Sequence, residues 1–362
     1  MLKLLDFINA NPDWEDRLSK PPYLIHTKRK DNYILFKYTQ RGLECTSDFS
    51  IELVRECRGI ILDEADNYTP VCVPFFKFAN YGESYADEID WSSAQVIEKI
   101  DGSLIKIWCH KGIWRVSTSG NINAGDAIVG SDGSSYLDVF EDARGKAKLN
   151  CDALDPQYTY LFELISPKTQ VVIPHMETKL YHIGTRNNST LQEVDICIGV
   201  EKPKMYTLTS IEKVIKTTEG LNQYHEGFVV VDKFFRRIKV KSPLYVKLHY
   251  TLGNCTTDKN IIDIIRSGEV DEVLNYFPEH APIFAEMRRK LEKFVATNEY
   301  ELEAVKATNH SSRKELAEHV VKATCPGCIF SVLDGKSPSV REFVMNLPID
   351  NLEKYLRTAI ET

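Results

Sequence analysis

The hydrophobic pattern of the chain changes near residue 255, and this change constrains the fold more than any other feature. From about residue 23 to 250, short apolar runs alternate with turn residues, which is typical of strands. Beyond this region, apolar residues between Ile283 and Val295 recur at helical spacing. Ser312-x-x-Glu315 is a capping-box signature for a further helix. The pattern therefore predicts an α+β body followed by an all-helical region.

Several elements of the body can be predicted from shorter patterns. Hairpins are expected where two apolar runs flank a polar turn, at Lys30-Asp31-Asn32, in the Asp/Asn-rich stretch after RGIIL, and at Lys111-Gly112. Further strands are expected at 158–165, 170–173, 180–184, 228–231 and 238–240, with a strand followed by a helix in 204–220. The N-terminal apolar stretch contains Asp6 and ends at Asn11-Pro12, so it is expected to form an amphipathic helix and not a signal peptide.

Length and composition indicate the class of protein. A chain of 362 residues suggests two domains, or one large domain with an appendage, and the change in pattern predicts domains at 1–254 and 255–362. No run of about 18 apolar residues occurs, so no membrane span is expected. The nine cysteines are scattered, which fits a reducing cytoplasm. The close pair Cys325 and Cys328 is expected to be either two buried thiols near a helix end or half of a metal site.

The net charge of −7 means that the whole molecule does not attract polyanions, so a nucleic-acid site would need a local basic patch. The segment KFFRRIKVKSPLYVK, residues 233–247, is dense in lysine and arginine. The density of basic residues alone does not distinguish a nucleic-acid site from the solvated face of a strand.

The segment IEKIDGSLIKIW, residues 97–108, places Lys99, followed by the single apolar residue Ile100, before an Asp-Gly-Ser turn between two strand-like runs. Gly102 lets the chain reverse sharply and brings backbone N–H groups near whatever the lysine faces. A lysine at a strand end is usually exposed and without a role, so its interpretation depends on charged motifs later in the chain.

Three such motifs place charged residues in strands. Glu163 lies inside the apolar run FELIS, where a carboxylate is costly unless it has a partner. Glu226 precedes a glycine and then an apolar strand in HEGFVVVD. Lys239 and Lys241 are two residues apart, and hence on the same face of a strand.

Together these motifs resemble, in order and separation, those of the covalent nucleotidyltransferases, which include DNA ligases, RNA ligases and mRNA capping enzymes. The segments ECRGIIL (56–62), PFFKFANYGES (74–84) and KSPLYVKLH (241–249) are similar to the phage RNA ligase 1 family, the tRNA-repair ligases of T-even phages. The resemblance covers most of residues 30–275. It implies a nucleotidyltransferase domain with antiparallel sheets around an ATP cleft, followed by an all-helical C-terminal domain that is a candidate for RNA specificity.

The resemblance also implies roles for the charged residues. Lys99 is the expected nucleophile, which attacks the α-phosphorus of ATP. Lys239 and Lys241 are expected across the pocket, where they would favour the neutral amine of Lys99 and hold the α-phosphate. Glu163 and Glu226 are expected to contact ATP and to lie near Mg²⁺.

Further residues are assigned by the same resemblance. The expected nucleotide contacts are Tyr38, Arg58, Lys77 and Val229, with His182 or Ile183 on the opposite face of the adenine. Tyr245 matches a tyrosine important for ligation, and Asp271 matches an acidic metal ligand in the helical region. The chain departs from its relatives at Ser119, where they carry a basic residue, so a contact to nucleotide or RNA is expected to be lost or moved.

The resemblance implies an ATP-dependent RNA ligase that requires Mg²⁺. Such an enzyme joins an RNA 5′-phosphate to a 3′-hydroxyl through lysyl-AMP and an RNA-adenylate, and the relatives repair broken tRNA after a polynucleotide kinase–phosphatase has acted, in the cytoplasm of a phage-infected bacterium. The alternatives are a DNA ligase, a GTP-dependent capping-type enzyme, and a nucleic-acid-binding relative that has lost catalysis. DNA ligases and capping enzymes are expected to carry a β-barrel after the paired lysines, whereas this chain is expected to be helical there.

Overall fold

The structure is a computed structural model that describes residues 2–39, 47–129, 132–251, 257–308, 310 and 312–358. These residues form two compact units, the first of which ends at His249. The second contains the helices from Asp258 onward. The domain boundary predicted between residues 254 and 255 lies outside the described residues, and the assignment of separate functions to the two parts stays a prediction.

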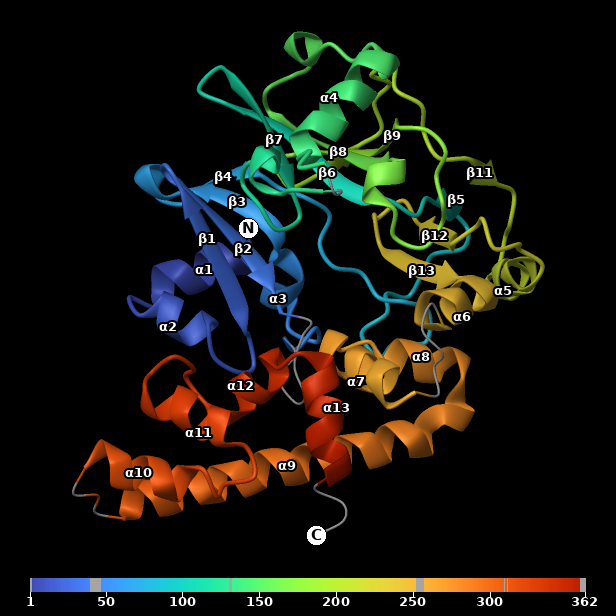
Figure 1. Ribbon diagram of the computed structural model, residues 1–362. Helices are drawn as coiled ribbons and strands as arrows, with labels where there is room; N and C mark the ends of the chain where they lie inside the picture. The colour runs from blue at the N-terminus through green and yellow to red at the C-terminus, as the bar shows by residue number, and fades with distance from the viewer. Residues whose placement is uncertain are drawn as a thin grey trace. The chain divides into compact units, whose positions relative to one another are not determined.

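The first unit begins with an antiparallel sheet in the order β1-β2-β3-β4 (Figure 1). Its strands are β1 (Ile25–Lys30), β2 (Tyr33–Tyr38), β3 (Arg58–Asp63) and β4 (Thr69–Cys72). Three helices pack against it: α1 (Lys3–Ala10), α2 (Trp14–Leu18) and α3 (Glu52–Glu56). Leu4, Trp14 and Phe36 meet in their shared core, which explains why the N-terminal helix is amphipathic.

The second sheet is antiparallel, with the strand order β10-β9-β8-β6-β7. Its strands are β6 (Ser103–His110), β7 (Ile113–Thr118), β8 (Tyr158–Ile165), β9 (Lys179–Asn187) and β10 (Glu193–Val194). Helix α4 (Tyr136–Ala147) covers one face of it, and Phe140 packs into a core with Phe162 (Figure 1). A capping box between Ser135 and Asp138 begins this helix.

The third sheet is also antiparallel, in the order β11-β5-β12-β13. It contains β5 (Gln95–Lys99), β11 (Met205–Tyr206), β12 (Gly227–Val231) and β13 (Arg237–Lys241). Helix α5 (Ile211–Glu219) packs on it through the buried Val214, and α6 (Pro243–Thr251) follows β13 in the chain. Short 3₁₀ turns complete the unit: Glu64–Asp66, Ala124–Asp126, Cys151–Ala153 and Pro167–Thr169.

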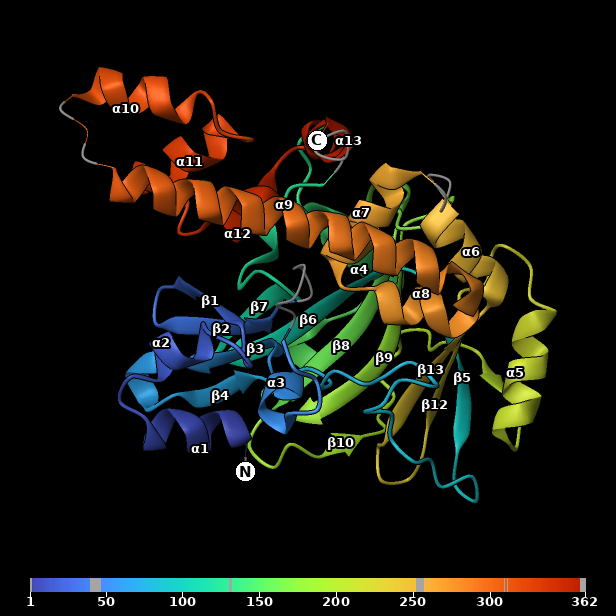
Figure 2. The same ribbon diagram turned by 90° about the horizontal axis from the view of Figure 1, so that it is seen from below.

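The part of the second unit that the structure describes contains helices and no strand. These are α7 (Asp258–Ser267), α8 (Val270–Tyr276), a 3₁₀ turn (Pro278–His280), α9 (Ala281–Ala307), α10 (Arg313–Val320), α11 (Pro326–Leu333), α12 (Val340–Asn346) and α13 (Ile349–Thr358). Within this unit α10 and α11 lie beside the C-terminal half of the long helix α9 (Figure 2). As the pattern predicted, Ser312 caps α10, and its hydroxyl accepts a hydrogen bond from the Glu315 amide at 3.2 Å.

The α+β fold class and the helical second part are confirmed, as are the hairpins at Asp31-Asn32 and Lys111-Gly112. The strand predicted at 170–173 is wrong. The amides of Val172 and Ile173 donate to the side chain of Asp101, at 3.0 and 2.7 Å, instead of joining a ladder. Apolar residues there are buried in an irregular segment, which a short apolar run cannot distinguish from a strand.

The paired cysteines lie at the start of α11, and both are buried. Burial raises the pKa of Cys328 to about 12, so this thiol is inert. Their burial at the start of this helix agrees with the expectation of buried thiols near a helix end.

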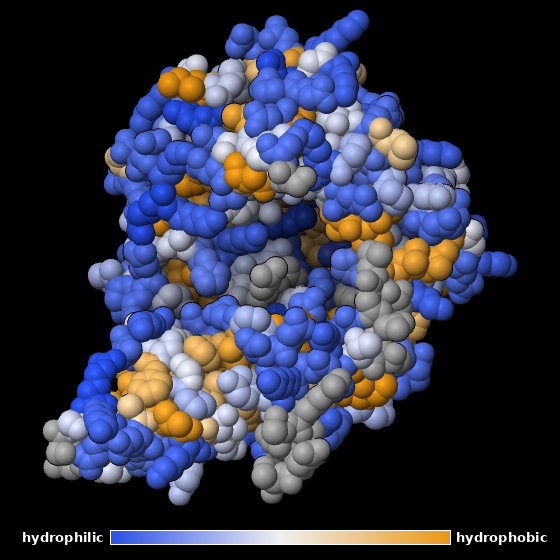
Figure 3. Space-filling model, in the orientation of Figure 1, coloured by the Kyte–Doolittle hydropathy of each residue, from blue (hydrophilic) through white to orange (hydrophobic). Residues whose placement is uncertain are grey.

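None of the helices that the structure describes is long and apolar enough to span a membrane. On the face shown in Figure 3, hydrophobic side chains lie in small groups among hydrophilic ones.

Candidate active site

Lys99 is the last residue of β5, and the turn after it carries the chain from the third sheet into β6 of the second sheet. Its ammonium nitrogen donates to Oε2 of Glu226 at 2.7 Å. The other oxygen of Glu226 lies 3.9 Å from the nitrogen of Lys241. Glu226 is buried, so its carboxylate is held between two lysines where water screens the charges weakly.

The strand register explains this arrangement. Gly227 on β12 pairs with Lys99 on one side and with Lys241 on the other, so the three residues form one row across the sheet. The prediction that Lys239 and Lys241 lie across the pocket from Lys99 is therefore wrong. All three lysines project from the same sheet, because β12 is inserted between their strands, and the opposite wall belongs to the second sheet.

A cavity of about 380 Å³ lies between these two sheets within the first unit. The third sheet contributes Lys99 and Val229, the second contributes Glu163, and β3 contributes Arg58. Val229 pairs with Ile97, and together they form an apolar patch on the wall of the cavity. Lys99, Val229, Glu163 and Arg58 were all predicted to belong to one nucleotide site, and the structure places them in one pocket.

Glu163 faces Lys99 and Glu226 across this cavity. Burial, together with the negative charge of Glu226, raises the pKa of Glu163 to about 7, while the positive charge of Lys99 opposes the rise. Two carboxylates can supply only part of a magnesium coordination shell. They fit an ion that keeps several waters and takes its other oxygens from substrate phosphates.

Further cations lie along a segment that runs beside β13. The carbonyl oxygen of Ala79 accepts a hydrogen bond from the Lys239 amide at 2.9 Å, which joins the segment to the strand. The Phe78 ring lies 5.4 Å from the Arg58 guanidinium carbon and 5.5 Å from the Lys239 nitrogen. This ring therefore holds two predicted phosphate ligands near one another.

Lys77 and Tyr38, both predicted nucleotide contacts, also lie together. The Lys77 nitrogen is 5.2 Å from the centre of the Tyr38 ring and 4.3 Å from that of Phe49. Burial raises the pKa of Tyr38, with the Arg58 charge acting against this, so the phenol is neutral.

His182 and Ile183 both line the cavity, on β9. The His182 side chain is buried, and burial lowers its pKa to about 4, so the imidazole is neutral. Its Nε2 lies 3.0 Å from the Gly184 carbonyl oxygen, which can only accept, so Nε2 carries the proton. The sequence analysis expected one of these two residues to cover the second face of the adenine, and both stay candidates. Phe75 and Phe78, which also line the cavity, were not predicted.

Tyr245 is buried on α6, and its hydroxyl donates to Oδ1 of Asp101 at 2.8 Å. The other oxygen of Asp101 accepts the amides of Val172 and Ile173, and its carbonyl lies 2.5 Å from Nε2 of His175. These bonds fix the turn that carries Lys99. A role for Tyr245 in ligation stays a prediction, and its contact with Asp101 gives it a positioning role.

Two remaining predictions concern other places in the chain. Asp271 is exposed in the first turn of α8, in the second unit, and its metal-binding role stays a prediction. Beside Ser119 lie lysines from other strands. The buried ammonium group of Lys106 donates to the Gly59 carbonyl oxygen, and a Cβ on Gly120 would lie 3.2 Å from the Lys37 nitrogen. Burial lowers the pKa of Lys106 to about 8. Positive charge is thus present near Ser119 without a basic residue at that position.

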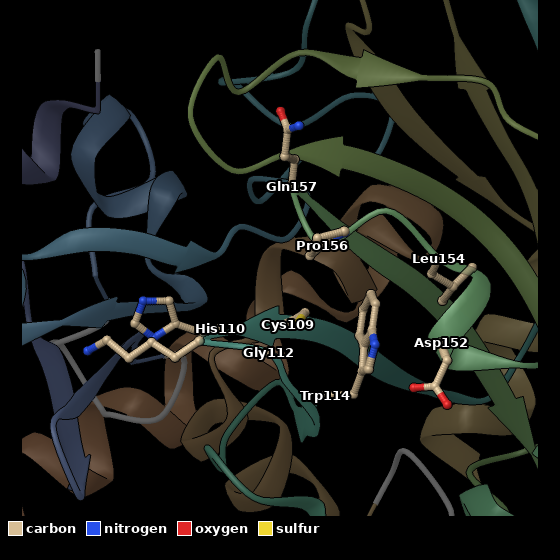
Figure 4. Close-up of a pocket in the computed structure, with 9 residues that line it drawn as sticks. Cys109, His110, Gly112, Trp114, Asp152, Leu154, Pro156 and Gln157 are labelled. Carbon is tan, nitrogen blue, oxygen red and sulfur yellow. The ribbon is translucent and has the colours of Figure 1, made fainter.

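A second cavity, of about 460 Å³, lies at the other end of β6 from the Lys99 turn. Figure 4 shows Trp114 between His110 on the hairpin turn and the segment 152–157. None of the predicted site residues lines it, so the Lys99 cavity is the candidate active site.

Comparison with known proteins identifies the family of the chain. A sequence model of the RNA ligase family matches residues 56–245, a range that contains Lys99, Glu163, Glu226 and both lysines of β13. The chain belongs to this RNA ligase family.

Individual relatives are similar over different lengths. The chain is 30% identical over 269 residues to a putative bifunctional polynucleotide kinase/RNA ligase of Autographa californica nuclear polyhedrosis virus. This match covers 67% of the chain but only 38% of the viral protein. The chain is 23% identical to an RNA ligase of Rhodothermus phage RM378, with 92% of each protein covered. Among solved structures, an archaeal ATP-dependent RNA ligase matches 88% of each chain, with a TM-score of 0.46 and 14% identity.

Proposed function

We propose that the protein is an ATP-dependent RNA ligase that works through a covalent adenylate on Lys99. The observation that carries this proposal is the Glu226 carboxylate held between Lys99 and Lys241, with Lys99 lining a cavity whose opposite wall holds Glu163. Family membership supports the reaction class, and the row supports the choice of nucleophile.

In the first step, the neutral amine of Lys99 attacks the α-phosphorus of ATP. A P–N bond forms, the bond to pyrophosphate breaks, and the lysine nitrogen gives up a proton. Lys241 and Lys239 lie on the same wall as the nucleophile, so their charges can offset the negative charge that builds on the α-phosphate. Arg58 lies beside Lys239 on the Phe78 ring and would hold the leaving phosphates in line.

The next two steps transfer AMP and seal the RNA. An oxygen of the RNA 5′-phosphate attacks the lysyl-AMP phosphorus, the P–N bond breaks and the amine of Lys99 is restored. The RNA 3′-hydroxyl then attacks the 5′-phosphorus, a phosphodiester forms and AMP leaves.

Glu163 and Glu226 would hold a magnesium ion directly or through its water shell, and the ion would supply positive charge at the phosphates. A cation that takes up the Glu226 carboxylate would also release Lys99 from its salt bridge, since the carboxylate holds that nitrogen at 2.7 Å.

The class of RNA substrate, the partner enzyme and the cellular compartment can also be proposed. RNA with 5′-phosphate and 3′-hydroxyl ends, such as broken tRNA, fits the family. The viral relative is named as a kinase joined to a ligase, which supports a functional partnership with a polynucleotide kinase–phosphatase. The free cysteines support a reducing cytoplasm.

A DNA ligase or a capping enzyme is a weaker proposal, because the described residues that come after the paired lysines form only helices and no barrel. A relative without catalysis is disfavoured because the lysine, both glutamates and the paired lysines all stand in one region of the first unit.

The test is incubation with α-labelled ATP and Mg²⁺, followed by denaturing electrophoresis. Wild-type protein should keep the label and Lys99→Ala should not. Lys216→Ala, a matched change on the exposed face of α5, should label like the wild type. Transfer of the label to a 5′-phosphorylated RNA, and not to the matched DNA, should follow.

Absence of label from wild-type protein that was first freed of bound AMP would refute the proposal. Label obtained with GTP and not with ATP would favour the capping-type reaction instead.

A further inference from the structure

The nucleotide pocket has a second end, and its distance from Lys99 can be derived from the strand register. On the side of the third sheet that borders the pocket, the strand register places residues in three rows: Lys99, Gly227 and Lys241; then Ile97, Val229 and Lys239; then Gln95, Val231 and Arg237. Successive rows are about 7 Å apart, because each is two residues further along a strand. A nucleotide with its α-phosphorus at Lys99 and its base on Val229 therefore points the edge of the base toward the Arg237 row.

Arg237 is bound to Glu193 at this end. Its two terminal nitrogens donate to the two carboxylate oxygens of Glu193, at 2.7 and 2.5 Å. The exposed fractions of the two side chains are only 12% and 10%, so solvent screens the pair weakly. The Arg237 guanidinium carbon also lies 4.1 Å from the centre of the Phe75 ring. Arg237, Glu193 and Phe75 all line the pocket.

The pair joins the two walls of the pocket, because Arg237 belongs to β13 of the third sheet and Glu193 to β10 of the second. The Phe75 ring also packs closely against Gly184 on β9, where a Cβ would clash with the ring. The orientation of the carboxylate is thus set by the fold before a nucleotide binds.

The two purines of nucleoside triphosphates differ in what they require at such an edge. Guanine presents two neighbouring N–H donors, at N1 and N2, which suit a free carboxylate with two acceptor oxygens. Adenine presents one donor, at N6, beside an acceptor nitrogen. A carboxylate whose two oxygens already accept hydrogen bonds from an arginine is a much weaker acceptor for the two N–H groups of guanine. The neighbouring acid in the lining, Asp195, is likewise paired, with Lys202.

We propose that Arg237 is a specificity-determining residue, which selects adenine by occupying the Glu193 carboxylate at the base end of the pocket. The inference rests on the proposed adenylylation of Lys99 and names the element that makes the reaction specific for ATP. Removal of the guanidinium would free the carboxylate to accept the two N–H groups of guanine.

The experiment compares initial rates of covalent labelling with α-labelled ATP and α-labelled GTP. In Arg237→Gln, the ratio of the ATP rate to the GTP rate should fall by at least about tenfold. In the double variant Arg237→Gln with Glu193→Gln, the ratio should return toward the wild-type value, because the freed carboxylate is gone. Both rates come from one preparation, so any loss of folded protein cancels in the ratio.

Arg236→Gln is the matched control. Arg236 is paired with Asp232 at 2.7 Å, in the same hairpin, but it does not line the pocket. The ratio of the ATP to the GTP labelling rate in Arg236→Gln should equal that of the wild type.

Three outcomes would overturn the inference: a wild type that labels equally with both nucleotides, an Arg237→Gln variant that loses both rates in the same proportion, or a double variant whose ratio stays low. Absence of label from the wild type with either nucleotide would instead overturn the ligase proposal, so the two failures can be told apart.

Discussion

The two ends of the nucleotide pocket differ in how their charges are balanced. At the Lys99 end, Lys99 and Lys241 share the single carboxylate of Glu226. Arg58 and Lys239 lie nearby on an aromatic ring, so these four cations outnumber the carboxyl groups of Glu226 and Glu163 there. At the Arg237 end, each cation has an acid of its own, as in the pairs of Arg237 with Glu193 and Lys202 with Asp195.

We propose that this difference orients the nucleotide. An excess of positive charge in a partly buried pocket attracts a polyphosphate, whereas a charge-compensated end gives it no advantage and suits a neutral heterocycle. The apolar patch of Val229 and Ile97 between the two ends fits the flat face of the base. We therefore expect the charge balance along the pocket, and not a single residue, to set which atom of the substrate meets Lys99.

The largest effect is expected from changes within the Lys99 row. Lys99→Arg keeps the positive charge but replaces the amine with a group that does not lose its proton, so labelling should fall by at least about 10⁴-fold. Lys241→Arg retains a cation beside Glu226 and removes no nucleophile, and its loss should stay below about 100-fold. Rates of lysyl-AMP formation measure both. Equal losses in the two variants would show that the row acts only through its charge.

The second effect tests the backbone that holds this row together. Gly227 has a φ of +142°, and a Cβ there would clash with the Val240 carbonyl oxygen and lie 2.7 Å from the Lys241 Cα. Gly227→Ala should lower the free energy of unfolding by about 2–4 kcal/mol and separate Lys241 from Glu226. Denaturant unfolding and labelling measure the two effects.

Gly112→Ala is its control, because Gly112 also has a positive φ, +75°, but its Cβ would meet nothing within 4 Å. This variant should lose only about 1 kcal/mol and keep its labelling rate. A Gly227→Ala variant no worse than the control would contradict the close packing of β12 against β13.

A third effect is expected from the carboxyl group on the opposite wall. Burial raises the pKa of Glu163 to about 7, so the group becomes a carboxylate only as the pH rises through that value. Labelling by the wild type should rise across this range. Glu163→Gln should be slower by about 10- to 100-fold at pH 8 and should lack this step. A pH profile that is identical in shape for both proteins would rule out titration of Glu163.

The same shift predicts a change in stability with a definite sign. Glu163 has a higher pKa when folded than its ordinary value of 4.5, so the stability that it contributes is present at low pH and is lost as the pH rises through about 7. Glu163→Gln cannot lose a proton. The melting temperature of Glu163→Gln minus that of the wild type should therefore be larger at pH 8 than at pH 5.

The smallest effect is expected at the base end. Lys202 and Asp195 form a pair whose side chains are 42% and 89% exposed, and such pairs contribute at most about 1 kcal/mol. Lys202→Gln should change the ratio of ATP to GTP labelling by less than about threefold, far less than Arg237→Gln. A larger change would show that Asp195, and not Glu193, is the acid that governs the choice between ATP and GTP.

Sequence patterns predicted the phosphate end better than the base end. Lys99, Glu163 and Glu226 could be recognised because each stands in a short motif, at a strand end for Lys99 and Glu226 and inside an apolar strand for Glu163. The order of strands could not be read in this way, so Lys241 was placed on the wrong wall. The contacts of Arg237 with Glu193 and Phe75 join strands from two sheets, and no local pattern encodes such a meeting.

Local signals were also missed or misread in the fold. Helix α4 was not predicted, although Ser135-x-x-Asp138 carries its capping signature. The apolar run at 170–173 was taken for a strand, although its amides bind Asp101. In the segment 170–173, burial of Val172 and Ile173 explains the apolar residues, and only the destination of the backbone hydrogen bonds distinguishes a strand from an irregular segment.

The most direct test of Lys99 as the nucleophile is to locate the AMP on the chain. Protein labelled with ATP would be digested under conditions that preserve a P–N bond, and the modified peptide sequenced by mass spectrometry. We predict AMP on Lys99 in the peptide that contains IEKIDGS, and on no other lysine of the pocket. AMP on Lys241, Lys239 or another residue would contradict the assignment of the Lys99 turn as the reactive end.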